Sequence, residues 1–185
     1  MADWLAALGA AGIGAVQIRE KDLDDRDLFA LTRLARAALP PSTRLLVNGR
    51  LDVAIAAGAD GVHLPADGVP ARPLRERFGP EVILGRSTHT IEEVERARED
   101  GVDYVTFGPV YATPGKGAPV GIAALARAAS LGVPVYALGG ITLDRLGELS
   151  RAGAAGVAAI RLFQQAADLK SLARAAGETF GRVGG

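Results

Sequence analysis

Polar and charged side chains directly follow a short apolar run near the start of the chain. Gln17, Arg19 and Lys21 share one alternation phase, which is opposite to that of Val16 and Ile18. In an extended segment, alternate side chains lie on the same face. Two cations and an amide on one face would suit an anionic or polar ligand, and the alternative is a solvent-exposed charge pair beside the neighbouring aspartates.

Later apolar runs are followed by polar residues in the same way, at Asn48, His63, Ser87, His89, Thr113, Lys116 and Arg161. Either histidine could exchange a proton near neutral pH or serve as a structural hydrogen-bonding residue. Two histidines so placed make no metal motif. Lys116 lies between two glycines, so it could close over a phosphate from a mobile loop or remain a solvated lysine.

A glycine pair, Gly139 and Gly140, lies between an apolar run and a helical pattern. Backbone N–H groups at the start of a helix bind anions, and Thr142 could cap that helix. The segment therefore predicts a phosphate site. A plain strand-to-helix turn that needs glycine for its geometry is the alternative.

Glycines also mark the elements that must position these residues. Glycines that end a helical pattern and precede a β-branched run recur about every 22 residues or twice that, with one longer interval of 31 residues between Gly101 and Gly132. They are Gly12, Gly58, Gly79, Gly101, Gly132 and Gly153. A repeat of one helix and one strand predicts βα units with parallel strands. The pattern gives about seven strands and eight helices, with the first helix over residues 3–11.

This repeat predicts an α/β fold, a TIM (β/α)8-type barrel that lacks its first strand, with residues 1–185 as a single domain. An open doubly wound sheet is the alternative, but it usually has about five or six strands. Residues 109–119 lengthen one strand-to-helix connection, and such a loop either holds a ligand or is a tolerated insertion.

The composition excludes several classes of function. Lys and Arg number 21, as do Asp and Glu, so no bulk field favours nucleic acid or an anionic membrane as a partner. The absence of cysteine excludes disulfides, thiolate zinc sites and thiol nucleophiles. No apolar run is long enough to suggest a membrane span, and we expect a cytoplasmic protein.

Six segments, taken in order, resemble the thiamin phosphate synthase/TenI family of TIM barrels over about residues 12–163. They are residues 16–22, 46–50, 58–64, 85–89, 104–116 and 137–142. The resemblance implies a synthase reaction that joins a hydroxymethylpyrimidine diphosphate to a thiazole phosphate, with Mg²⁺ and with loss of pyrophosphate.

The same resemblance implies a role for each residue named above. Gln17, Arg19, Lys21 and Asn48 would line the pyrimidine diphosphate pocket, and Ser87, Thr113 and Lys116 would contact the pyrophosphate. The turn at Gly139 and Gly140 would bind the thiazole phosphate together with the backbone of Ile160 and Arg161. Arg19, Lys21, Ser87 and Lys116 are thus the candidate catalytic residues, and His63 and His89 are candidate ligand contacts.

The chain departs from the family pattern at the metal site. Gly49 and Gly68 stand where the synthases have two Mg²⁺-binding aspartates, which leaves Asp67 as the only acid nearby. Gly115 replaces a threonine of the pyrophosphate loop. Pro109 stands where TenI-like tautomerases have a histidine.

Residues 48–50, 64–65 and 85–87 resemble the TenI branch. The leading hypothesis is therefore a TenI-like barrel that binds a thiazole phosphate or thiamin phosphate, with no metal ligand set of its own. The alternatives are an active synthase in which Asp67 and substrate phosphates hold Mg²⁺, a thiazole tautomerase that uses His63 or His89, and a non-catalytic regulatory barrel. A barrel that lacks a strand has exposed edges, which a second copy of the chain could cover as a homo-oligomer.

Overall fold

The computed structural model describes residues 2–181. They contain one sheet of seven parallel strands, and each strand pairs with the next along the chain. The strands are β1 (Ala15–Ile18), β2 (Arg44–Asn48), β3 (Gly61–Leu64), β4 (Ile83–Thr88), β5 (Tyr104–Phe107), β6 (Val135–Leu138) and β7 (Gly156–Ala158). The predicted strand number and parallel βα order are confirmed, and the doubly wound alternative is wrong because the strand order never reverses.

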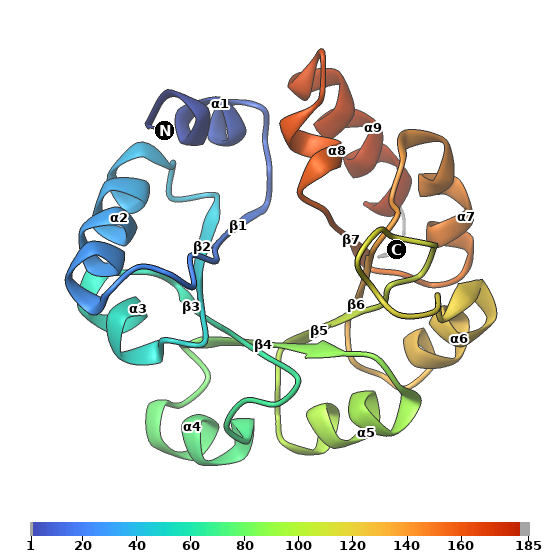
Figure 1. The fold of residues 1–185 in the computed structure, drawn as a ribbon, viewed down its shortest axis with the longest axis horizontal. Helices are drawn as coiled ribbons and strands as arrows, with labels where there is room; N and C mark the ends of the chain where they lie inside the picture. Colours follow the sequence, from blue (N-terminus) through green and yellow to red (C-terminus); the bar gives the residue numbers. More distant parts are fainter. Residues whose placement is uncertain (1, 182–185) are drawn as a thin grey trace.

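Helices surround this sheet (Figure 1). They are α1 (Ala2–Ala10), α2 (Asp25–Ala38), α3 (Leu51–Ala57), α4 (Ala71–Phe78), α5 (Ile91–Glu99), α6 (Gly121–Ala129), α7 (Leu146–Arg151), α8 (Arg161–Gln164) and α9 (Leu169–Phe180). A 3-10 turn, η1 (Leu143–Arg145), precedes α7. The prediction of eight helices misses α8, a single turn too short to give a helical pattern of its own.

Local sequence explains where several helices begin and end. Asp24 caps α2 by accepting the backbone N–H of Asp27 at 2.9 Å. Thr90 and Glu93 form a reciprocal capping box at the start of α5, which satisfies backbone N–H groups that have no partner within the helix. Gly58 ends α3 with φ at 75°, the left-handed conformation that glycine adopts without a Cβ penalty.

The two faces of the sheet have different compositions. Val62, Leu84, Val105 and Val135 face the helices and are buried in one apolar cluster. The inner face instead carries aromatic and polar residues, among them Tyr104. The outer face is therefore apolar, because the helices exclude water from it, whereas the interior of the barrel also carries polar side chains.

The barrel is open between its first and last strands. Within residues 2–181, β1 pairs only with β2 and β7 only with β6. Helices α1 and α9, which contact one another, lie on the two sides of this opening (Figure 1). Leu5 and Leu8 of α1 are buried against Ile18 and Leu39, so this helix is anchored to the outside of β1. No helix among residues 2–181 has the length and apolar character needed to cross a membrane.

Candidate functional site at the barrel rim

Because all the strands are parallel, their carboxyl ends form one rim, and the predicted site residues lie along it. At the end of β1, the Gln17 side-chain amide donates to Oδ1 of Asn48, the last residue of β2, at 3.1 Å. Gln17 thus turns toward the neighbouring strand end, while Ile18 is buried among the outer helices. This agrees with the predicted alternation of the two faces.

His63 lies inside the barrel and is only 3% exposed. Its Nδ1 is 2.8 Å from the hydroxyl of Tyr104, and its Nε2 is 2.9 Å from Oγ of Ser87. Burial and, secondly, the positive charge of Arg19 lower the pKa of His63 to about 4. The site disfavours the charged form of His63, which favours its role as a neutral hydrogen-bonding residue at pH 7 over proton exchange.

His89 occupies a different environment. It is exposed just beyond β4, and its Nδ1 is 2.5 Å from the carbonyl oxygen of Gly108. This contact ties the end of β4 to the start of the long connection after β5. The structure therefore does not join the two histidines into one acid–base pair.

Arg19 and Lys21 are exposed beyond the end of β1. The charge of Arg19 contributes, after burial, to the lowered pKa of His63. Nearby Asp25 forms an ion pair with Arg50, and Arg50 also pairs with Asp52. Arg50 therefore joins the first turns of α2 and α3. Sequence reasoning missed Arg50, because its partners lie on two separate helices.

The long connection after β5 packs against the glycine pair on the next strand. The Val110 N–H donates to the Leu138 carbonyl at 2.8 Å, and the Tyr111 N–H donates to the Gly139 carbonyl at 3.2 Å. A Cβ on Gly139 would lie 2.5 Å from Cβ of Pro109. Close backbone approach is thus one reason for glycine at this position, as the plain-turn alternative proposed.

A second cluster holds the same turn from the other side. The Arg145 guanidinium lies 4.1 Å from the centre of the Tyr111 ring and donates to the Gly140 carbonyl at 2.5 Å. The Tyr111 hydroxyl donates to Glu148 at 2.7 Å, and its pKa is raised to about 12, mainly by burial and then by that carboxylate. Neither Arg145 nor Glu148 carries a motif in the sequence that would have marked it.

The expected capping of a regular helix by Thr142 is not observed. Thr142 precedes the 3-10 turn η1, and its side chain makes no capping hydrogen bond to the backbone there. The reason is local: the chain enters a tight 3-10 turn, stabilised by the backbone bond from Arg145 to Thr142, before α7 begins.

The remaining candidates lie at the same rim. Thr113 donates to the Tyr111 carbonyl at 2.9 Å, and the Lys116 N–H donates to the Thr113 carbonyl at 3.1 Å, which places exposed Lys116 at the tip of the loop. Ile160 and Arg161 follow β7, the strand paired with β6, so they lie beside the glycine pair. Ile160 is 65% exposed.

Few side chains at this rim could bind a metal ion. Gly49 has φ at 70°, and Gly68 lies in the loop that carries Asp67. Within residues 2–181, no group of three or more His, Asp or Glu side chains is arranged to hold a metal ion. A single carboxylate provides few of the oxygen ligands that Mg²⁺ needs.

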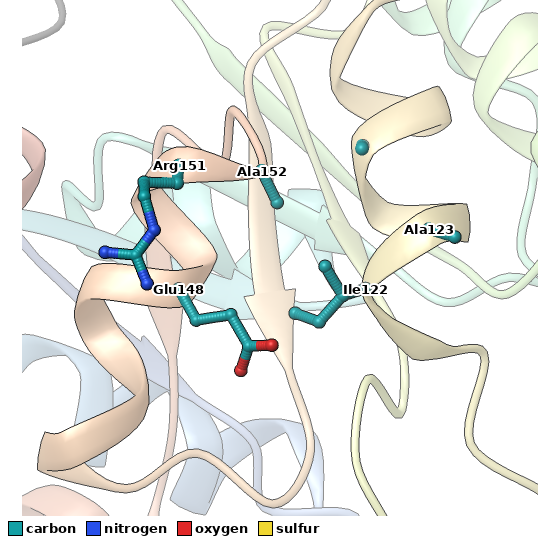
Figure 2. A pocket seen from close by; sticks show the side chains of 6 residues that line it. Ile122, Ala123, Glu148, Arg151 and Ala152 are labelled. Atoms are coloured by element: carbon teal, nitrogen blue, oxygen red, sulfur yellow. The ribbon is translucent and has the colours of Figure 1, made fainter.

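An open groove on the outer surface lies apart from the rim. Ile122 and Ala123 of α6 line one side, and Glu148 and Arg151 of α7 line the other (Figure 2). None of the predicted site residues lines it. Glu148 of this groove accepts the hydrogen bond of the Tyr111 hydroxyl, which links the groove to the rim loop. We place the candidate site at the rim, where the predicted residues lie.

Seven parallel strands inside a ring of helices, with polar and cationic residues at their carboxyl ends, define a protein of the TIM-barrel class. Residues 1–163 match the family described as thiamine monophosphate synthase. The chain therefore belongs to the thiamine monophosphate synthase/TenI family.

Individual relatives agree with this assignment. The chain is 42% identical to the thiamine-phosphate synthase of Anaeromyxobacter dehalogenans, over 91% of this chain and 77% of that protein. It is 41% identical to the thiamine-phosphate synthase of Roseiflexus sp. (strain RS-1), over 95% of this chain and 76% of that protein. The structure of thiamine phosphate pyrophosphorylase from Pyrococcus furiosus has a TM-score of 0.86 at 28% identity, covering 100% of this chain and 91% of that one. These names point to the synthases and do not single out the TenI branch.

Proposed function

We propose that this protein is a thiamine-phosphate synthase, which joins a pyrimidine diphosphate to a thiazole phosphate and releases pyrophosphate. This reverses the order of the sequence-based hypotheses, which placed a TenI-like binding protein first. The main support is that one rim carries two groups of anion-binding candidates. Arg19 lies near the Gln17–Asn48 pair, and Lys116 lies on the loop packed against the glycine pair. The names of the relatives support the same reaction.

In this proposal each side of the rim holds one substrate. Gln17, Asn48 and Arg19 bind the pyrimidine diphosphate, and the Gly139–Gly140 turn with Ile160 and Arg161 binds the thiazole phosphate. The carbon–oxygen bond to the diphosphate breaks, and its electron pair leaves with pyrophosphate. The thiazole nitrogen then forms the new carbon–nitrogen bond with its lone pair.

The cations act on the leaving group. Negative charge grows on the pyrophosphate as the carbon–oxygen bond breaks, and fixed cations at that position stabilise the transition state more than the ground state. Arg19, Lys21 and Lys116 supply that charge, and Ser87 and Thr113 supply hydroxyl donors. Lys116 closes over the diphosphate from its loop and lowers the amount of water at the reacting carbon.

The family resemblance also implies Mg²⁺, but the side chains of this chain do not fit it. Of the three acidic positions expected near the site, Asp67 alone keeps a carboxylate, as Gly49 and Gly68 replace the others. No step of the proposed reaction is therefore assigned to a protein-bound metal ion.

A coupling assay with both phosphorylated substrates tests the proposal, with thiamine phosphate and pyrophosphate as the measured products. We expect Lys116→Ala to reduce kcat/KM about a hundredfold, because it removes a charge that stabilises the leaving group. Lys170→Ala, which removes an exposed lysine of α9, is the matched control. Wild-type protein that forms no thiamine phosphate would contradict the proposal.

A second candidate function is binding without condensation, as in the TenI-like hypothesis. The loss of both metal-binding aspartates favours it. Calorimetry with thiazole phosphate and with thiamine phosphate separates the two functions. Binding of either ligand by a protein that produces no thiamine phosphate would favour the second, whereas turnover excludes it.

A further inference from the structure

Three polar side chains on neighbouring strands form a continuous hydrogen-bonded chain inside the barrel. Tyr104 of β5 lies 2.8 Å from Nδ1 of His63 on β3, and Nε2 of His63 lies 2.9 Å from Oγ of Ser87 on β4. His63 is 3% exposed, while Ser87 is half-buried toward the rim. These hydrogen-bonded side chains thus connect the interior of the barrel to the candidate site.

The surroundings of Tyr104 fix its hydroxyl as a donor. Its ring occupies the space that a side chain on Gly85 would fill, because a Cβ there would lie 2.1 Å from Cζ of Tyr104. Burial raises the pKa of Tyr104, so the hydroxyl keeps its proton. Among residues 2–181, its hydrogen-bond partner is Nδ1 of His63. A buried O–H group donates to an available acceptor, so Nδ1 accepts.

The protonation state of His63 then sets the direction of the second bond. A neutral imidazole carries one proton, and with Nδ1 as the acceptor that proton is on Nε2. Nε2 therefore donates to Oγ of Ser87. The opposite arrangement would leave the proton of the half-buried Tyr104 without an acceptor among residues 2–181, which costs free energy.

We propose that Tyr104 and His63 are positioning residues that make Ser87 a fixed hydrogen-bond donor to an oxygen of the substrate diphosphate. Because the Ser87 oxygen already accepts a bond from His63, its own proton is directed toward the rim. Ionised phosphate oxygens accept hydrogen bonds and do not donate them, so a fixed donor suits an oxygen of this kind. The identity of the ligand rests on the proposed function, whereas the direction of the hydrogen bonds does not.

Nitrogen-15 NMR of the histidine rings tests the direction directly, on the full chain labelled at histidine. The His89→Gln variant identifies the signals of His63. We expect the His63 proton on Nε2 between about pH 6 and pH 8, where an exposed histidine would titrate. A proton on Nδ1, or on both nitrogens, would overturn the proposal.

Calorimetric binding of inorganic pyrophosphate tests the consequence. We expect Ser87→Ala to bind about tenfold more weakly, because a hydrogen bond to a charged group is lost. Tyr104→Phe keeps the ring but frees Nδ1, so the His63 proton can move and Ser87 can turn inward. We expect about fivefold weaker binding and a change in the His63 nitrogen signals.

Tyr136→Phe is the matched control, because Tyr136 packs edge-on against Tyr104 and lies outside the hydrogen-bonded chain. It should bind pyrophosphate like the wild type, and thermal unfolding of both variants shows whether either loses its fold. Equal affinity of Tyr104→Phe and wild type for pyrophosphate would overturn the positioning role of Tyr104 and His63. Failure of the wild type to bind pyrophosphate would overturn it as well. If the variants show these changes in pyrophosphate binding but the wild type forms no thiamine phosphate, only the proposed function is contradicted.

Discussion

Single residues at this rim acquire their chemistry from their surroundings. His63 is an ordinary histidine in the sequence, but the barrel interior lowers its pKa to about 4 through burial and through the charge of Arg19. His89 is exposed and contacts the Gly108 carbonyl. The same residue type thus has two different roles.

The buried His63 makes stability depend on pH. The unfolded imidazole takes up a proton below its ordinary pKa of 6.5, whereas the folded one does so only near pH 4. The unfolded state thus binds more protons between these values, so stability is full above about pH 6.5 and falls, by up to about 3 kcal/mol, as the pH drops toward 4. Urea unfolding across this range measures it. His63→Gln should lose the dependence and His89→Gln should retain it, and equal slopes in both variants would contradict the assignment.

The loss of metal ligands predicts weak binding of Mg²⁺ by the protein alone. Asp67 is a single carboxylate, and no metal-binding cluster exists among residues 2–181. We expect calorimetry with MgCl₂ and no substrate to detect no site tighter than about 1 mM. A tighter site that disappears in Asp67→Asn would show that this carboxylate has partners that we have not identified.

At the scale of the elements, close packing between strands depends on small residues at particular positions. The Tyr104 ring of β5 lies across Gly85 of β4, and the Tyr136 ring of β6 lies across Gly156 of β7, where an added Cβ would be 2.7 Å from Cε1. Each of these two rings therefore lies against a glycine of a neighbouring strand inside the barrel, and the two rings contact each other edge-on. This packing also directs the Tyr104 hydroxyl toward His63.

Alanine at two glycines should have effects of opposite sign. Gly85→Ala places a Cβ 2.1 Å from the Tyr104 ring, and we expect it to lower the free energy of unfolding by about 2 kcal/mol or more. Gly177 lies within α9, and an added Cβ there meets no atom within 4 Å. Gly177→Ala should raise stability by about 0.5 kcal/mol, because alanine has the higher helix propensity. Urea unfolding measures both, and equal stability of the two variants would contradict this account of the packing.

For the molecule as a whole, the open sheet has a centre and two edges. In the described residues β1 and β7 each have one paired neighbour, and β4 has two. Buried outer-face residues such as Val62, Leu84 and Val105 also gather around the central strands. Local openings therefore need less free energy at the edges than at the centre.

Hydrogen exchange should reflect this arrangement. We expect backbone amides of β4 and β5 to be the most protected, and those of β1 and β7 to exchange at least about tenfold faster through local opening. Mass spectrometry of deuterium uptake measures each strand. Protection of β1 and β7 equal to that of β4 would show that another chain or segment covers the open edges.

The sequence alone determined the alternation of helices and strands, because glycine at the helix ends and β-branched runs are local signals that recur with the βα unit. It also placed Gln17, Asn48 and the glycine pair at strand ends, and Lys116 on the long loop after a strand. A parallel sheet brings these positions to one rim. Comparison of the sequence with the family pattern also showed that Gly49 and Gly68 replace two carboxylates.

Only the tertiary structure decided which of these residues touch one another. The Tyr104–His63–Ser87 chain joins three strands, and the Arg145 contact with Tyr111 joins a 3-10 turn to a distant loop. Such contacts depend on strand register and on the space left by Gly85, which no local pattern encodes. The neutral state of His63 is likewise a property of its buried site, because desolvation acts only once the barrel has formed.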